Sequence, residues 1–182
     1  MMDGLIQRMI RAAKLDVSLY EEVEADKTAM GQAMTVVVLS SVAAGLGNMT
    51  MGGLKGLVLI TLIALIGWVV WAYLTYFIGT RLLPEPQTEA DLGQLLRTIG
   101  FSSAPGLVRI LGILPFLRNI VFLAAGIWML WAMIIAVRQA LDYRSTWRAV
   151  GVCLIGWLVQ TAMLALFFSL VGHPTMMHHG GP

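Results

Sequence analysis

Charged residues are scarce in this sequence. Only 12% of its 182 residues are Asp, Glu, Lys or Arg, about half the share of an ordinary soluble domain, whereas 58% are apolar. This shortage argues against a chain that has water as its main solvent. The net charge of +2 also provides no strongly basic surface of the kind that binds nucleic acid, so no nucleic-acid partner is expected.

Cysteine and histidine are equally scarce. The single cysteine, Cys153, lies inside an apolar run, so we predict no internal disulfide and a packing role for its thiol. The three histidines, His173, His178 and His179, all fall in residues 172–182, which we interpret as a flexible tail. Metal binding by this Met- and His-containing tail is the weaker alternative. With no catalytic constellation, cofactor motif or expected metal site, we predict that the protein is not an enzyme.

Long apolar runs dominate what is present. Residues 31–49, 56–79, 119–137 and 149–171 contain no Asp, Glu, Lys, Arg or His, and each reaches or approaches the ~20 residues that a membrane-spanning helix needs. Residues 98–115 form a weaker fifth run, either a broken span or part of a re-entrant hairpin. The sequence predicts an all-α, polytopic integral membrane protein whose residues 31–171 form a five-helix transmembrane bundle.

Residues 1–30 precede the bundle as an arm. At 100° per residue, residues 1–15 place apolar side chains on one face and Arg8, Arg11 and Lys14 on the other. This pattern predicts an amphipathic helix that lies in the plane of the lipid headgroups.

Four carboxylates follow that helix, at Glu21, Glu22, Glu24 and Asp26. One hypothesis is a docking surface for cytoplasmic partners. The alternative is a solvated acidic linker that repels the lipid surface.

The distribution of Lys and Arg predicts the orientation. With a cytoplasmic N-terminus, five spans leave nine Lys and Arg residues inside, only Lys55 and Arg118 outside, and the C-terminus outside. The cytoplasmic pieces are then the arm, residues 80–97 and residues 138–148. In the second piece, Thr88 is predicted to cap a helix, with Asp91 three residues later.

Arg109 is the one charge inside a predicted span, and no acid within the spans is available to pair with it. We predict an intramembrane polar site of Arg109, Ser102, Ser103 and Gln160, which would bind an anion or a lipid headgroup. The alternative is an Arg109 side chain that a short, tilted helix lifts to the outer headgroups.

Two further patterns concern packing. The tryptophan pairs of "WVVWA", residues 68–72, and "WMLWA", residues 128–132, lie within predicted spans, and we expect them to pack between helices. Small residues recur at four-residue spacing in residues 40–47, which predicts close helix contacts in the bundle or, alternatively, in a dimer.

Three segments carry a resemblance to a known family: "LDVSLYEEVEADKTAMGQA" from Leu15, "GTRLLPEPQTEADLGQLLRTIGFSSAPGLVRIL" from Gly79, and "WMLWAMIIAVRQALDYRSTWRAVGVCLIGWLV" from Trp128. Together they resemble a prokaryotic member of the Yip1-domain family. The resemblance implies five transmembrane helices, a cytosolic N-terminus and no enzymatic activity.

Eukaryotic relatives in that family are associated with small GTPases and vesicle trafficking. Their Asp-Leu-Tyr-Gly-type motif is echoed here by Asp16, Leu19 and Tyr20, but Glu21 stands in place of the glycine. We therefore do not expect a small GTPase as partner.

These patterns predict a non-enzymatic protein of a prokaryotic inner membrane that needs no cofactor. It would act as a scaffold that associates with itself, with other membrane proteins or with cytoplasmic partners. The alternative function is a small-solute permease or channel that uses Arg109 and the broken third span.

Overall fold

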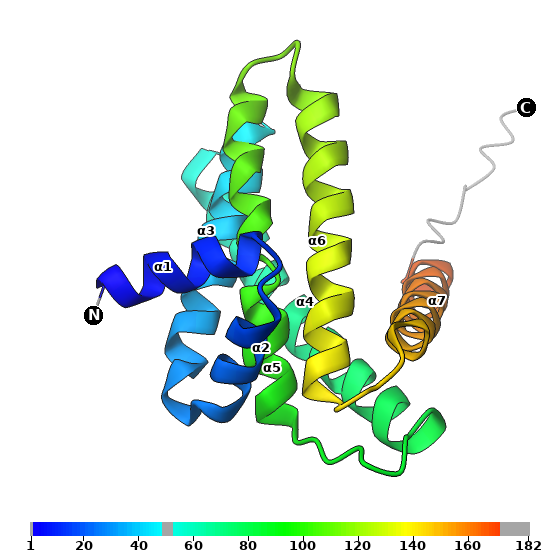
Figure 1. The fold of residues 1–182 in the computed structure, drawn as a ribbon. Coiled ribbons are helices and arrows are strands. Elements are labelled where there is room, and N and C mark those ends of the chain that lie inside the picture. Colours follow the sequence, from blue (N-terminus) through cyan, green and yellow to red (C-terminus); the bar gives the residue numbers. More distant parts are fainter. Residues whose placement is uncertain (1, 49–52, 172–182) are drawn as a thin grey trace, which may run out of the picture.

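The computed structural model describes residues 2–48 and 53–171, and the regular structure in these ranges is helical (Figure 1). This confirms the all-α fold class. The elements are α1 (Met2–Ala13), α2 (Val17–Ala25), the 3₁₀ turn η1 (Lys27–Ala29), α3 (Met30–Gly47), α4 (Gly53–Phe77), its π-helical extension η2 (Ile78–Leu82), α5 (Leu92–Phe101), the 3₁₀ helix η3 (Ala104–Ile113), α6 (Arg118–Ala140) and α7 (Thr146–Val171). The predicted tail, residues 172–182, lies outside the described residues.

Three described helical stretches are long and apolar enough to cross a membrane: Lys27–Gly47, Leu54–Leu82 and Arg118–Ala140. They correspond to the first, second and fourth predicted spans. The fifth predicted span coincides with α7, which is 26 residues long. In Figure 1, α6 runs along the plane of the view whereas α7 is seen nearly along its axis, so the two helices cross steeply. The arrangement of five side-by-side spans therefore stays a prediction.

The third predicted span, residues 98–115, is not one continuous α-helix. It begins inside α5, breaks at Ser102 and Ser103, and continues as the 3₁₀ helix η3. A 3₁₀ helix has three residues per turn, so residues at three- and six-residue spacing share one face. Gly106 and Gly112 therefore lie on the same face of η3.

That glycine face packs directly on α3. A Cβ added to Gly106 would lie 2.1 Å from Oγ of Ser40, and one added to Gly112 would lie 2.8 Å from the carbonyl oxygen of Gly47. A side chain at Gly112 would push the two helices apart, and one at Gly106 would displace the side chains of Ser40 and Met129. The small residues of α3 thus serve a contact inside the chain.

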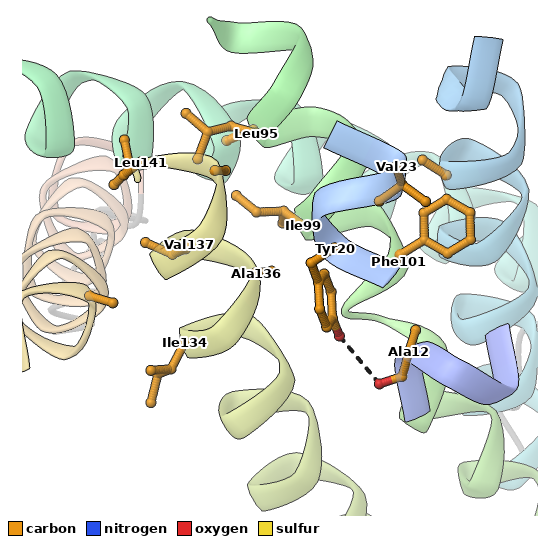
Figure 2. Packing of buried hydrophobic residues seen from close by; sticks show 14 of the residues in the cluster. Ala12, Tyr20, Val23, Leu95, Ile99, Phe101, Ile134, Ala136, Val137 and Leu141 are labelled. Carbon is orange, nitrogen blue, oxygen red and sulfur yellow. Dashed lines mark hydrogen bonds between the residues drawn. The ribbon is translucent and has the colours of Figure 1, made fainter. Parts of the chain in front are cut away.

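The C-terminal part of α6 is more deeply buried in the protein than its N-terminal part. No residue from Ala132 to Ala140 is exposed, and Ile134, Val137 and Ala140 belong to a core shared with Tyr20 of α2 (Figure 2). Large apolar side chains are exposed only earlier on this helix, from Ile120 to Trp131. The surface of α6 that lipid could cover therefore ends near Trp131.

The helix α1 lies crosswise at that level. In Figure 1 it runs across the axes of α3, η3 and α6, and the indole Nε1 of Trp128 donates a hydrogen bond to the carbonyl oxygen of Ala13, at 2.7 Å. Ala12 is fully buried, whereas Ile6 and Ile10 are about half exposed. An orientation across the other helices, with an open apolar face, is what a helix in the membrane interface requires.

The two tryptophan pairs differ in their surroundings. Trp68 is buried and donates its indole hydrogen to the carbonyl of Leu96, and Trp71 is partly buried, as expected for packing between helices. Trp128 and Trp131 are 38% and 54% exposed. Trp128 contacts the end of α1, so the expectation of packing was wrong only for Trp131, which lies at the end of the apolar surface of α6.

The loop before α5 and the loop before α7 meet at one end of the molecule. The hydroxyl of Tyr143 lies 3.0 Å and 2.7 Å from the carbonyl oxygens of Gly79 and Leu83, and burial raises the pKa of this hydroxyl to about 12. The Arg148 guanidinium pairs with Glu85 at 3.1 Å. The two loops that the charge count assigned to one side of the membrane thus lie together.

Candidate functional site

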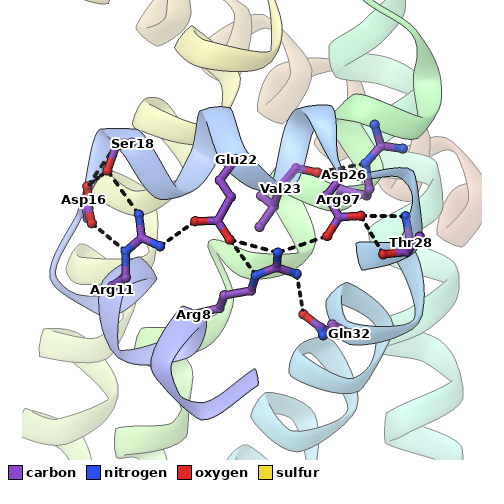
Figure 3. Close-up of polar contacts among 10 residues, drawn as sticks. All are labelled: Arg8, Arg11, Asp16, Ser18, Glu22, Val23, Asp26, Thr28, Gln32 and Arg97. Carbon is purple, nitrogen blue, oxygen red and sulfur yellow. Dashed lines mark hydrogen bonds and ion pairs between the residues drawn. The ribbon is translucent and has the colours of Figure 1, made fainter. Parts of the chain in front are cut away.

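The positive face of α1 turns toward the carboxylates of α2 (Figure 3). Nε of Arg8 donates to Glu22 at 2.8 Å, its second nitrogen donates to Asp26 at 2.9 Å, and its third donates to the side-chain oxygen of Gln32 at 2.8 Å. Every nitrogen of this guanidinium therefore has a partner in the protein.

Arg11 is engaged in the same way. Its Nε donates to Asp16 at 2.8 Å, and its terminal nitrogens donate to Glu22 at 2.5 Å and to the hydroxyl of Ser18 at 3.1 Å. These bonds lower the pKa of Glu22 and, together with Ser18, lower the pKa of Asp16 to about 2. The prediction of an amphipathic helix is met, but the two arginines bind the carboxylates around α2, and Lys14, which follows α1, is the exposed cation of the predicted basic face.

A buried arginine of α5 binds the C-terminal end of α2. Arg97 of α5 is 5% exposed, its Nε donates to the carbonyl oxygen of Val23 at 2.9 Å, and a terminal nitrogen donates to the carbonyl of Glu24. A cation at the C-terminus of a helix is favourable because the last carbonyls lack partners within the helix. We name the assembly of α1, α2 and these three arginines the arm clamp.

The predicted acidic docking surface is divided by this arrangement. Glu22 and Asp26 face α1 inside the arm clamp. Glu21 and Glu24 project to the other side, where they accept hydrogen bonds from Gln139 at 2.9 Å and from Gln94 at 3.2 Å. The four carboxylates thus do not form one surface, and they are not part of a free linker either.

Glu21 and Glu24 line a cavity of about 520 Å³ between α2, α5, the end of α6 and the loop before α7. Arg138, Asp142 and Arg144 complete its charged wall. These three residues and Arg97 were not among the candidate residues predicted from the sequence. The available signal was the charge of residues 80–97 and 138–148. The charge count had assigned these two segments, together with the arm, to the same side of the membrane.

Glu24 is the carboxylate of this cavity with the most altered acidity. Partial burial, with the nearby negative charge of Asp142 second, raises the pKa of Glu24 to about 7. Its carboxyl group therefore changes charge near neutral pH.

The predicted intramembrane site is partly assembled. Arg109, Ser103 and Gln160 line one cavity of about 300 Å³ between α3, α4, η3, α6 and α7. Ser102 does not line it, because this serine is buried and donates its hydroxyl hydrogen to the carbonyl of Ile99 at 2.7 Å. Ser103 and Arg109 share the glycine face of η3, because six residues are two turns of a 3₁₀ helix.

The environment of Arg109 is apolar. One terminal nitrogen lies 2.7 Å from Sδ of Met129, and the guanidinium carbon lies 5.9 Å from the ring centre of Phe122. Among the described residues, the buried Nε of Arg109 has no hydrogen-bond partner. The side chain therefore has capacity to bind an anion.

No metal centre is formed in the part of the chain that the structure describes, since no three His, Cys, Asp or Glu side chains are grouped there. The residues that echo the eukaryotic motif have structural positions. Asp16 caps α2 by accepting from the backbone nitrogen of Ser18, and Leu19 and Tyr20 are fully buried.

Apolar helices of membrane-spanning length, with polar loops and an ion-paired arm gathered at one end, define a polytopic membrane protein without a catalytic constellation in its described residues. Residues 19–168 match the family model of the Yip1 domain, and the chain belongs to the Yip1 domain family. Comparisons with curated proteins and with solved structures give no match.

Proposed function

We propose that the protein is a non-catalytic scaffold of a prokaryotic inner membrane, with five spans and a cytoplasmic N-terminus. In this proposal, the end formed by the arm clamp and the two loops faces the cytosol and recruits a partner protein. The observation that carries the proposal is the open cavity of about 520 Å³ at this end.

The carboxylates of the cavity offer acceptors to a basic partner segment, although Glu24 is only partly ionised near neutral pH. Its lining contains three carboxylates, Glu21, Glu24 and Asp142, and two arginines, Arg138 and Arg144. The backbone oxygen of Tyr143 accepts from Nε of Arg138, which draws one of the cations toward the loop. A Lys or Arg side chain of a partner would find carboxylate acceptors on two sides.

A photo-crosslinking residue at Ala25, an exposed member of the cavity lining, tests this proposal in native membranes. We expect a discrete adduct with a partner or a second copy, and we expect Glu21→Gln combined with Glu24→Gln to abolish it. Glu89→Gln is the matched control, because Glu89 is an exposed carboxylate outside the cavity. Adducts that persist in the double variant would contradict recruitment through this cavity.

A second candidate function, permeation of a small solute, is supported by the cavity at Arg109. Flux into reconstituted liposomes tests it with wild type and Arg109→Leu. Flux that is lost in the variant would support permeation, and flux no greater than that of empty liposomes would refute it.

A further inference from the structure

The guanidinium of Arg109 is a positive charge without a counter-ion among the described residues. Its contact atoms are a thioether sulfur and an aromatic ring, which are weak acceptors, and its Nε donates to no described group. Charge in such surroundings is costly unless an anion accompanies it. A phosphate oxygen pair fits the free side of a guanidinium because both groups are planar forks of matching width.

The cavity around Arg109 offers hydroxyl and amide groups and no carboxylate. Ser40, Ser41, Ser103 and Gln160 supply these neutral polar groups. A bound anion would therefore meet donors and no repelling charge. The ammonium of a zwitterionic headgroup would find no acidic partner in the same lining.

An apolar groove of about 600 Å³ adjoins this polar cavity. Its walls include Trp71, Leu130, Leu154 and Trp157, from α4, α6 and α7. Trp71, Met129 and Met133 line both spaces, so one side of the polar cavity is also a wall of the groove. The combined site suits an amphiphile, because it has a cationic polar end beside an apolar groove.

The position of the site along α6 agrees with such a ligand. Met129, which touches the Arg109 guanidinium, follows Trp128, the residue that binds the end of α1. The exposed apolar surface of α6 ends two residues further, at Trp131. Lipid headgroups lie at the level where apolar surface ends and tryptophans gather.

We propose that the polar cavity and the groove together bind one anionic phospholipid of the leaflet on the α1 side. The phosphate is held by Arg109, and one acyl chain occupies the groove between Trp71, Leu154 and Trp157. This proposal extends the lipid-headgroup alternative for Arg109 and does not depend on the recruitment of a cytoplasmic partner.

Native mass spectrometry of the delipidated protein tests this proposal with phosphatidylglycerol and phosphatidylcholine. We expect a single phosphatidylglycerol to bind about tenfold more tightly, because both lipids offer the phosphate but the choline ammonium of phosphatidylcholine would be desolvated in a lining without a carboxylate. Arg109→Gln should remove this preference, whereas the groove-filling Leu154→Trp should weaken the binding of both lipids. The cation control Lys55→Gln, at the start of α4, should retain the preference.

Further measurements distinguish a bound phospholipid from free phosphate. Dihexanoyl phosphatidylglycerol and inorganic phosphate should compete poorly, because neither fills the groove. Arg109→Lys, which keeps the charge but loses the planar fork, should bind several-fold more weakly and serves if Arg109→Gln does not fold. Equal binding of the two lipids by wild type, unchanged preference in the folded Arg109 variants, or full displacement by inorganic phosphate would each overturn the proposal.

Discussion

The arm clamp depends on Arg97, and its removal gives a quantitative prediction. In Arg97→Leu, the carbonyl groups of Val23 and Glu24 lose their buried donors while the apolar volume of the side chain is largely kept. A hydrogen bond to a charged group contributes ~1.5–3 kcal/mol. Because removal also relieves the desolvation of the guanidinium, we expect a net loss of about 2–4 kcal/mol in the docking of α2.

Hydrogen exchange of the protein in nanodiscs measures this loss. A change of about 2–4 kcal/mol raises the population of undocked α2 roughly 30- to 900-fold, so amides of Val17–Ala25 should exchange faster by that factor. Amides of α4 should not change. Arg81→Leu is the control, because Arg81 is an exposed arginine at the end of η2. Wild-type protection of α2 in a folded Arg97→Leu protein would refute the role given to Arg97.

Three other predictions concern packing, acidity and the loops. Gly106→Ala should lower the free energy of unfolding by about 1–3 kcal/mol, because its Cβ would meet Ser40, whereas Gly126→Ala, with nothing within 4 Å, should be neutral or stabilising in thermal unfolding. Since the folded-state pKa of Glu24 is raised to about 7, the contribution of Glu24 to α2 docking should be largest below pH 4.5 and fall by about 1–2 kcal/mol as pH rises through 7, and exchange of α2 amides in Glu24→Gln should lack this loss. The pKa values of Asp16, Glu22 and Asp26 are lowered, so their ion pairs should weaken only as pH falls below the ordinary carboxyl range. Tyr143→Phe should cost about 1 kcal/mol in thermal stability by releasing the α4 end from the loop before α7, and an unchanged melting temperature would contradict that link.

The helices with long apolar runs were the easiest to predict from the sequence. Apolar runs of 19 to 24 residues leave few alternatives to a helix, so residues 31–49, 56–79, 119–137 and 149–171 could be assigned from composition. The arm was harder, because a helical wheel identifies the basic face of α1 but not what that face meets. A sequence signal was present in the acids that follow Arg8 and Arg11, which are 5 to 18 residues further along the chain.

Local chemistry was less predictable at α5 and η3. Thr88 was expected to cap α5, but Asp91 caps it by a reciprocal pair of bonds with Gln94, and the Thr88 hydroxyl accepts from the backbone nitrogen of Glu85. Both residue types are good caps, and tertiary contacts decide between them. The 3₁₀ geometry of η3 has a sequence signal in the six-residue spacing of Gly106 and Gly112, which the apolar count did not use.

The two candidate sites differed in how far the sequence could define them. Arg109 was conspicuous because a charge inside an apolar run is rare, and Ser103 and Gln160, which were predicted with it, line the same cavity. The cavity at Glu21 and Glu24 combines α2, α5, the end of α6 and the loop before α7, and such a combination depends on tertiary packing. Sequence reasoning therefore identified Glu21 and Glu24 but could not separate them from Glu22 and Asp26.

Accessibility of single cysteines in intact cells tests the membrane topology most directly. In a Cys153→Ala background, Glu89→Cys probes the loop before α5, and Phe116→Cys probes the exposed turn before α6. We expect an impermeant thiol reagent to label position 116 and to reach position 89 only after the cells are opened. Labelling of position 89 but not 116 in intact cells would reverse the orientation and contradict a cytosolic arm clamp.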